Sequence, residues 1–305
     1  MNETAPEARR GAEWLRRDAE RITGTLPPLM AEAERLAHTV VSGVHGRRRA
    51  GPGEAFWQFR HAVPGDTAER IDWRQSARSD ALYIRQMEWE SAQSVQIWVD
   101  DSLAMDYRSD LARRSKGARA RLLALALSVL LVRGGERVAL MGTPAARPRS
   151  GEAQLTRIAT ELATDAPDRP DYGAPPDDPM VRGGRAVFLS DFMGPRDEVF
   201  PALSRAAEAG VVGACVQILD PAEESFPFDG RVVFRSMGGV VDFETQRARA
   251  LREAYRARLA ERQATLHDMA RRTGWHALIH HTTDSPRAAL LWLYMAIGGL
   301  ARAGG

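Results

Sequence analysis

Cysteine and lysine are almost missing from this sequence. Cys215 is the only cysteine among the 305 residues, which excludes an intrachain disulfide and a zinc site built on clustered cysteines. It lies in an apolar run and is expected to be a small core residue. Lys116 is the only lysine. The other basic residues are arginines, which form ion pairs with carboxylates inside the chain or at an interface. A GC-rich genome would produce the same bias, and we favour that explanation.

A net charge of either sign is also nearly missing. Lys plus Arg number 42 and Asp plus Glu number 40, so the excess is too small to indicate a polyanionic partner. Aromatic residues alternate with arginines in FWQFRH and YIRQMEWE, but such spacing is more typical of core strands than of base stacking. We therefore expect no nucleic acid among the partners.

Long apolar runs are missing as well. The longest, AALLWLYMAIGGLA at 288–301, is shorter than the roughly 18 residues that a membrane-spanning helix needs, so a buried terminal helix is expected there. The polar N-terminal stretch MNETAPEARRGAEW does not resemble a secretory signal. We predict no transmembrane segment and a cytoplasmic location.

The pattern of the chain predicts three regions: a helical N-terminal extension over residues 1–50, a segment with short strands over 51–93, and an α/β domain over 94–305. In the extension, a second helix is predicted from apolar residues at helical spacing. These are Leu29, Met30, Ala33, Leu36, Ala37 and Val40.

Apolar runs alternate with helical patterns from residue 94 onward. Continuous apolar strands separated by helices predict a doubly wound, mainly parallel sheet covered on both faces. The expected strands are SVQIWVDD, ERVALMGT, RAVFLSDF, GVVGACVQILD, GRVVFRS and WHALIHH, and the main helices are 108–133, GEAQLTRIATELA, 196–209, 245–273 and the terminal one. The loop DAPDRPDYGAPPDDP is expected to be a surface excursion.

Acidic and hydroxyl side chains follow two of these strands. Asp100, Asp101 and Ser102 end the first strand, and Asp191 ends the third. The carboxyl ends of parallel strands meet at one edge of a sheet, where ligands bind. We therefore expect Asp100 and Asp191 to lie close together, and their oxygens are of the kind that Mg²⁺ prefers.

The stretch Asp100-x-Ser102-x-Ala104-Met105, followed by a long helix and later by LSDF, resembles a von Willebrand factor A domain. The resemblance implies a Rossmann-like fold and a metal-ion-dependent adhesion site of the form Asp-x-Ser-x-Ser, completed by a Thr and an Asp. Here Ala104 replaces the second serine, and only Ser150 could substitute for the threonine.

We therefore predict a degenerate metal site formed by Asp100, Ser102 and Asp191. It would hold Mg²⁺ or Mn²⁺ completed by water, or no ion, and the sequence favours neither outcome. The structural alternative is that Asp100 and Asp191 cap the segments that follow them.

Residues 59–90, FRHAVPGDTAERIDWRQSARSDALYIRQMEWE, carry a second resemblance. Their motifs resemble those of the family named domain of unknown function 58 (DUF 58), over roughly residues 45–300 of this chain. Ala62 and Glu69 depart from that pattern. The matching motifs are Arg60, Pro64-Gly65-Asp66, Ile71-Asp72-Trp73 and Ser76-Ala77-Arg78.

We expect this segment to be mainly a scaffold. Asp66 and Asp72 would accept backbone hydrogen bonds, Asp72 would pair with Arg78, and Trp73 would anchor the segment on a core. Whether Arg74 and Arg78 belong to that scaffold or face a partner is open.

The family resemblance implies association with a MoxR-type AAA+ ATPase and a chaperone-like role in assembling or maturing other proteins. We predict a non-enzymatic adaptor that contacts partners through the strand end, including Asp101, and through Arg74 and Arg78. The alternative is a metal-dependent hydrolase or phosphotransferase that uses Asp100 and Asp191.

The enzyme alternative has little further support in the sequence. His281 and Arg196 are the only candidates for its base and its anion clamp. No Gly-x-Ser-x-Gly elbow or phosphate-binding loop is present. His280 and His281 are adjacent in a strand and would point to opposite faces, which disfavours a shared metal ion.

Overall fold

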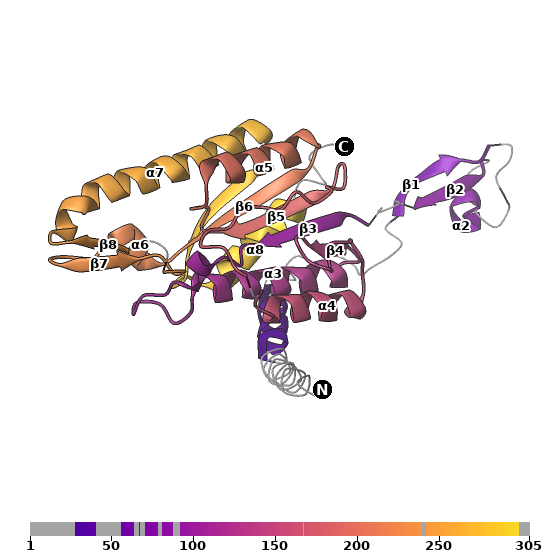
Figure 1. Cartoon of the computed structure of the whole chain (residues 1–305). Coiled ribbons are helices and arrows are strands. Elements are labelled where there is room, and N and C mark those ends of the chain that lie inside the picture. The colour runs from indigo at the N-terminus through magenta and orange to yellow at the C-terminus, as the bar shows by residue number, and fades with distance from the viewer. Residues whose placement is uncertain are drawn as a thin grey trace, which may run out of the picture. The chain divides into compact units, whose positions relative to one another are not determined.

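The computed structural model describes residues 28–40, 56–63, 67, 71–78, 81–87, 92–166, 168–239 and 242–298. The chain divides into two compact units (Figure 1), a small one of residues 47–92 and a large one of residues 1–46 and 93–305. The predicted first N-terminal helix and the Pro64-Gly65-Asp66 turn lie outside the described residues.

The large unit contains a five-stranded sheet in which all neighbouring strands are parallel. This confirms the predicted α/β class. The strand order is β4-β3-β5-β6-β9. The strands are β3 (Ser94–Val99), β4 (Arg137–Leu140), β5 (Arg185–Ser190), β6 (Val212–Leu219) and β9 (His276–His281).

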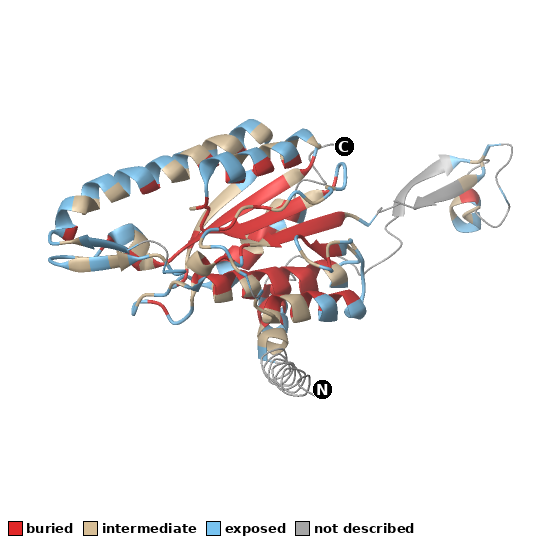
Figure 2. Cartoon of the chain, viewed as in Figure 1, coloured by how far each residue is buried: buried red, intermediate tan, exposed pale blue. Residues whose placement is uncertain are grey.

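Helices cover both faces of this sheet, as its apolar strands require. One face packs on α3 (Lys116–Arg133), α4 (Glu152–Ala163), α8 (Pro286–Gly298) and the helical residues 28–40. The other packs on α5 (Arg196–Glu208) and α7 (Ala248–Thr273). Figure 1 shows α5 and α7 on the side of the sheet opposite α3 and α4. Buried residues are concentrated in the sheet and in α3 (Figure 2).

Helix α3 starts later than predicted, at Lys116. The hydroxyl of Ser115 accepts a hydrogen bond from the Ala118 N–H at 3.2 Å and so caps the first turn. The residues before it instead form the 3-10 helix η2 (Leu103–Asp106) and a loop. The apolar pattern of residues 108–133 therefore predicted this helix correctly but not the residue at which it begins.

A short helix and a hairpin connect β6 to α7. The helix α6 (Pro221–Ser225), which was not predicted, begins with a capping box formed by Asp220 and Glu223. The strand β7 (Val232–Arg235) pairs antiparallel with β8 (Asp242–Thr245). Helix α7 therefore starts at Ala248 and not at 245.

The small unit consists of β1 (Phe56–His61), paired antiparallel with β2 (Tyr83–Met87), and the single-turn helix α2 (Trp73–Ser76). Asp72 caps α2 by accepting a hydrogen bond from the Gln75 N–H at 2.9 Å. The Ser76 hydroxyl donates to the Asp72 carbonyl at 2.8 Å and accepts from the Tyr83 N–H at 2.9 Å, which ties α2 to β2.

Two scaffold predictions for this unit are wrong. Trp73 is 60% exposed, so it does not anchor the segment on a core. Asp72 and Arg78 form no ion pair with each other in the part of the chain that the structure describes, and Arg78 is exposed. The backbone cap of Asp72 and the bridging hydroxyl of Ser76 hold this segment instead.

Helix α8 buries Ala289, Leu290, Leu293 and Ile297 in the core of the large unit. Among the described residues, no helix is both long enough and apolar enough to cross a membrane.

A buried polar network ties α3 to the end of β9. His280 is 3% exposed, and its Nε2 lies 3.1 Å from the Arg119 guanidinium. That guanidinium also donates to the carbonyls of Thr282 and Asp284, at 2.7 and 2.8 Å. Burial, with Arg119 adding to it, lowers the pKa of His280 to about 4. His280 is therefore neutral at pH 7 and accepts the hydrogen bond from Arg119.

Replacing His280 with Gln should flatten the loss of stability in acid. Since the folded-state pKa is depressed, the unfolded state binds the extra proton, and the wild type loses up to about 3 kcal/mol as the pH falls from about 6.5 to 4. In urea denaturation across this range, the free energy of unfolding of His280→Gln should fall less steeply with decreasing pH than that of the wild type. The exposed His267→Gln variant should follow the wild type, and a slope shared by all three proteins would contradict the assignment.

Candidate functional site at the carboxyl edge of the sheet

Asp100 and Asp191 directly follow β3 and β5 at the carboxyl edge of the sheet, and the order of the strands reverses at β3. The chain passes from β3 to β4 on one side and then to β5 on the other side of β3. In open α/β sheets, ligands bind at the carboxyl ends of the strands at this point. The structure brings Asp100, Ser102 and Asp191 to this edge, as the sequence indicates.

Asp100 joins the ends of the two central strands. Its side chain accepts hydrogen bonds from the Ser102 N–H at 2.9 Å and from the Ser190 hydroxyl at 2.6 Å. Asp100 is 1% exposed, and this burial, together with the nearby charge of Asp191, raises the pKa of its carboxyl group. The contacts fit the structural alternative, in which Asp100 organises the loop that follows it.

Asp191 forms a buried ion pair that the sequence did not reveal. The Lys116 ammonium lies 2.7 Å from Asp191 Oδ2 and 2.6 Å from Glu223 Oε1. The Lys116 and Asp191 side chains are 2% and 3% exposed. The ring of Tyr107 lies 5.8 Å from the ammonium. We name the three charged residues Lys116, Asp191 and Glu223 the Lys116 triad.

Charge interactions decide the protonation of the Lys116 triad. Burial acts to lower the pKa of Lys116, but the carboxylates of Asp191 and Glu223 outweigh it and hold that pKa above its usual value. Burial raises the pKa of Glu223, and Lys116 opposes this effect. Lysine is therefore fully charged at neutral pH, and its charge is shared between two carboxylates.

A loop packs directly over Asp100 and the residues that follow it. The carbonyls of Pro170 and Asp171 accept hydrogen bonds from the N–H groups of Leu103 and Ala104, at 2.8 and 2.9 Å. A side chain at Gly173 would collide with the Asp100 carboxylate, since its Cβ would lie 2.1 Å from Oδ1. The Pro/Asp-rich loop is therefore an excursion that closes the strand end.

Arg169 holds this loop in place. Its guanidinium pairs with both oxygens of Asp106 at 2.8 Å and donates to the Ser102 carbonyl at 2.9 Å. It also donates to the carbonyl of Asp101. An arginine fork used in this way fixes geometry as well as charge.

With Lys116 in place, the donor set at the carboxyl edge does not fit a divalent cation. All four carboxylate oxygens of Asp100 and Asp191 accept hydrogen bonds, and the ammonium already supplies a positive charge. The Ser102 hydroxyl is buried and has no hydrogen-bond partner within the described part of the chain. Among the described residues, no group of three or more His, Cys, Asp or Glu side chains could hold a metal ion.

Ser150 does not complete the site. It is exposed and follows Arg149, which bridges to Val138 near the start of β4, and so it lies away from the carboxyl edge. The expectation that it could replace the threonine ligand is wrong, because the loop does not reach across the sheet.

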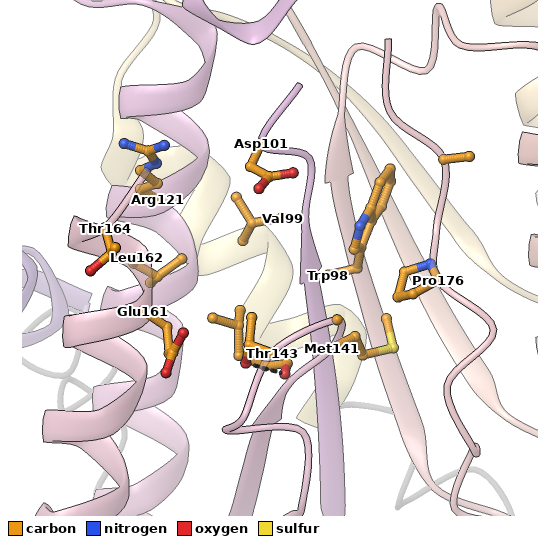
Figure 3. Close-up of a pocket in the computed structure, with 13 residues that line it drawn as sticks. Trp98, Val99, Asp101, Arg121, Met141, Thr143, Glu161, Leu162, Thr164 and Pro176 are labelled. Atoms are coloured by element: carbon orange, nitrogen blue, oxygen red, sulfur yellow. Dashed lines mark hydrogen bonds between the residues drawn. The ribbon is translucent and has the colours of Figure 1, made fainter. Parts of the chain in front are cut away.

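Asp101 lies in a small cavity beside the edge. The cavity has a volume of about 200 Å³, and Figure 3 shows Asp101 between Trp98 on one side and Arg121 on the other. Arg121 is paired with Asp165 at 2.7 Å. The Asp101 carboxylate has no hydrogen-bond or salt-bridge partner among the described residues. Asp101 is exposed, as are Arg74 and Arg78 on the small unit.

The residues named for the enzyme alternative are engaged elsewhere. His281 Nε2 lies 2.7 Å from Glu224, and Arg196 pairs with Glu261 at 2.7 Å on the face covered by α7. His280 and His281 make separate contacts, as expected for adjacent strand residues.

Comparisons with known proteins identify a family. The family described as "Protein of unknown function DUF58" matches residues 58–265. This confirms the resemblance carried by the 59–90 motifs.

Mycobacterial relatives cover most of the chain. "Uncharacterized protein Rv1480" of Mycobacterium tuberculosis and "Uncharacterized protein Mb1516" of Mycobacterium bovis are each 29% identical over 266 residues, covering 83% of this chain and 82% of theirs.

Two solved structures are similar at low identity. BatB, a conserved hypothetical protein from Bacteroides thetaiotaomicron, is 14% identical with a TM-score of 0.40 and covers 70% of this chain and 100% of its own. An aerotolerance-related membrane protein from Bacteroides fragilis is 16% identical with a TM-score of 0.38 and covers 68% and 100%.

Replacing Lys116 with Met should destabilise the protein by roughly 3–5 kcal/mol, because two buried carboxylates lose their partner. Urea denaturation at pH 7 measures this. The matched control is the triple variant Lys116→Met, Asp191→Asn, Glu223→Gln, which removes all three charges and should recover much of the loss. A single variant as stable as the wild type would contradict the buried ion pair.

Replacing Lys116 with Ala should create a metal site at the carboxyl edge. Removal of the ammonium frees Asp191 Oδ2 and Glu223 Oε1, which both contact it in the wild type, to act as oxygen ligands. Mn²⁺ should then raise the melting temperature of Lys116→Ala, since an ion that binds only the folded state stabilises it. It should leave the wild type unchanged. Stabilisation of the wild type by Mn²⁺ would show that Lys116 does not take the place of the ion.

Proposed function

This chain belongs to the family described as protein of unknown function DUF58, and from that premise we propose that it is a non-enzymatic protein-interaction module. The observation that carries the proposal is the Lys116 triad. In it Asp191 is paired with Lys116, whereas a hydrolytic mechanism would need this residue free as a metal ligand or base. The ion pairs of the triad also hold the carboxyl edge in one geometry.

The features around the triad support a role in binding. The covering loop and Arg169 close the strand end, while Asp101 remains exposed at its margin with an unpaired carboxylate. A fixed surface with one free charge favours recognition of a partner by direct polar contacts. In this proposal the degenerate adhesion site needs no bridging ion, because Lys116 supplies the cation.

The partner implied by the family resemblance is a MoxR-type AAA+ ATPase. We place the chain with such an ATPase in a chaperone-like role, in assembly or maturation of other proteins. A cytoplasmic location, where ATP is supplied, belongs to the same proposal. Asp101, Arg74 and Arg78 are the exposed residues that we assign to the contact.

Co-purification from the native host tests this function. Tagged wild-type protein, cross-linked before lysis, should recover an AAA+ ATPase that mass spectrometry identifies. Asp101→Asn should lower the recovery several-fold by removing the free carboxylate. The control Glu208→Gln removes an exposed carboxylate at the last residue of α5 and should not change it.

Two results would count against the proposal. One is repeated failure to recover any AAA+ ATPase with the wild-type protein. The other is metal-stimulated hydrolysis by the purified chain that disappears in Asp191→Asn.

A further inference from the structure

An aromatic pocket lies next to the Lys116 triad. It has a volume of about 440 Å³ and is formed by α6, the β7–β8 hairpin, α7 and Tyr107. That volume falls within the range of ligand-binding pockets. Glu223 of the triad is part of its wall, so the buried ion pair fixes one side of the pocket.

The apolar walls are held in place by ring contacts. Phe226 is buried and lies 5.7 Å from Phe234 and 5.0 Å from Tyr255, measured between ring centroids. Phe226 also has a positive φ of 45°, a strained conformation for a residue with a side chain, which such packing must maintain. Phe234 and Tyr255 are only half-buried, so their remaining surface is open to a ligand.

The polar groups of the pocket are mostly donors. The hydroxyls of Tyr107 and Tyr255 have no hydrogen-bond partner among the described residues. Burial, with acidic neighbours adding to it, raises the pKa of both phenols, so they stay protonated. The exposed Arg258 guanidinium also lines the pocket without an ion-pair partner in the described chain. Glu223 is paired with Lys116, which offsets part of its charge and so reduces its repulsion of an anion.

Positive charge extends along the adjoining turns of α7. Arg252 donates to the Phe226 carbonyl at 3.1 Å, and Arg256 donates to the carbonyls of Glu224 and Ser225 at 3.2 and 3.3 Å. These contacts connect the end of α6 to α7, and neither arginine pairs with a carboxylate among the described residues. The pocket therefore combines an apolar floor with a cationic rim.

Apolar surface continues beyond the pocket on the same hairpin. Phe243 pairs directly with Phe234, so their side chains share one face of the hairpin. Phe243 is 50% exposed, and Met237 in the connecting turn is 49% exposed. A small molecule would fill the pocket and leave these side chains in water, whereas a protein partner would cover them.

We propose that the aromatic pocket binds a peptide segment of a protein partner, with an aromatic or large aliphatic side chain in the pocket and an adjacent carboxylate on Arg258. This inference rests on the proposed function and specifies where a partner docks. The apolar anchor supplies most of the affinity, as buried aromatic residues do at interfaces. The arginine selects an acidic neighbour by charge complementarity.

Fluorescence polarisation with the full-length protein tests the site. The probes are fluorescein-labelled peptides Gly-X-Glu-Asp-Gly in which X is Trp, Phe, Leu or Ser. The three apolar peptides should bind at least tenfold more tightly than the serine peptide. Amidated versions with Gln and Asn in place of the acids should bind several-fold more weakly.

Two variants and one control locate the binding. Ala254→Trp places a large side chain at an exposed position that lines the pocket, and Arg258→Gln removes the rim charge. Ala254→Trp should weaken the apolar peptides at least tenfold and Arg258→Gln several-fold, while each leaves the urea midpoint near the wild-type value. Arg249→Gln removes an exposed charge of the same helix that does not line the pocket and should have no effect.

Three outcomes would overturn the proposal: equal binding of the serine peptide, no binding of any peptide, or binding that both variants leave intact. Binding of decanoate in place of the peptides would assign the pocket to a small apolar acid. Co-purification of the AAA+ ATPase with Ala254→Trp distinguishes the peptide-binding pocket from the adaptor function. If recovery persists while the peptides bind only the wild type, the pocket serves another partner and the adaptor function stands.

Discussion

The ion pairs of Lys116 with Asp191 and Glu223 are the contacts on which the carboxyl edge depends. Lys116 is the first residue of α3, where the positive end of the helix dipole disfavours a cation. Burial adds a second penalty. Two carboxylates, at 2.7 and 2.6 Å, overcome both effects. They come from the end of β5 and from α6, so a single ammonium connects three elements that are distant in sequence.

The same ion pairs connect the edge to the aromatic pocket. Glu223 binds Lys116 through one oxygen and the Asp220 N–H through the other, at 2.8 Å, which places α6 against α3. Asp220 in turn accepts a hydrogen bond from the Ser109 N–H at 2.9 Å, fixing the loop that carries Tyr107. The pocket wall and the strand-end loop are therefore parts of one hydrogen-bonded assembly. A change in the charge of Lys116 would affect both.

Local sequence patterns predicted the elements whose own residues show a continuous apolar or helical pattern. The strands β3 and β5 are nearly continuous apolar runs, and their parallel arrangement brings Asp100 and Asp191 to one edge. The strand β8 was missed because its residues, DFET, are mostly exposed and depend on pairing with β7. Trp73 was misplaced because a large apolar side chain does not reveal which surface, if any, will cover it.

The triad was beyond prediction for a related reason. Glu223 is 107 residues from Lys116, and no periodicity links them. The one available signal was that a chain rich in arginine has a single lysine, next to the Ser115 cap. Lysine carries its charge on a compact ammonium and arginine on a planar fork, so the two are not interchangeable at a site shaped around one of them. The rarity of lysine thus had a structural meaning at this position, whatever the cause of the arginine bias elsewhere.

A cation that is part of the chain differs from a bound ion in one physical respect. A metal ion dissociates, so an edge that used one would change its charge with the ion concentration and with chelators. Lys116 cannot leave the folded protein, and its raised pKa keeps it charged at every pH at which the protein would function. In the function proposed above, the strand end is a constant feature of the surface. Control of partner binding must then come from the partner or from the exposed groups around the edge, such as Asp101 and the rim of the aromatic pocket.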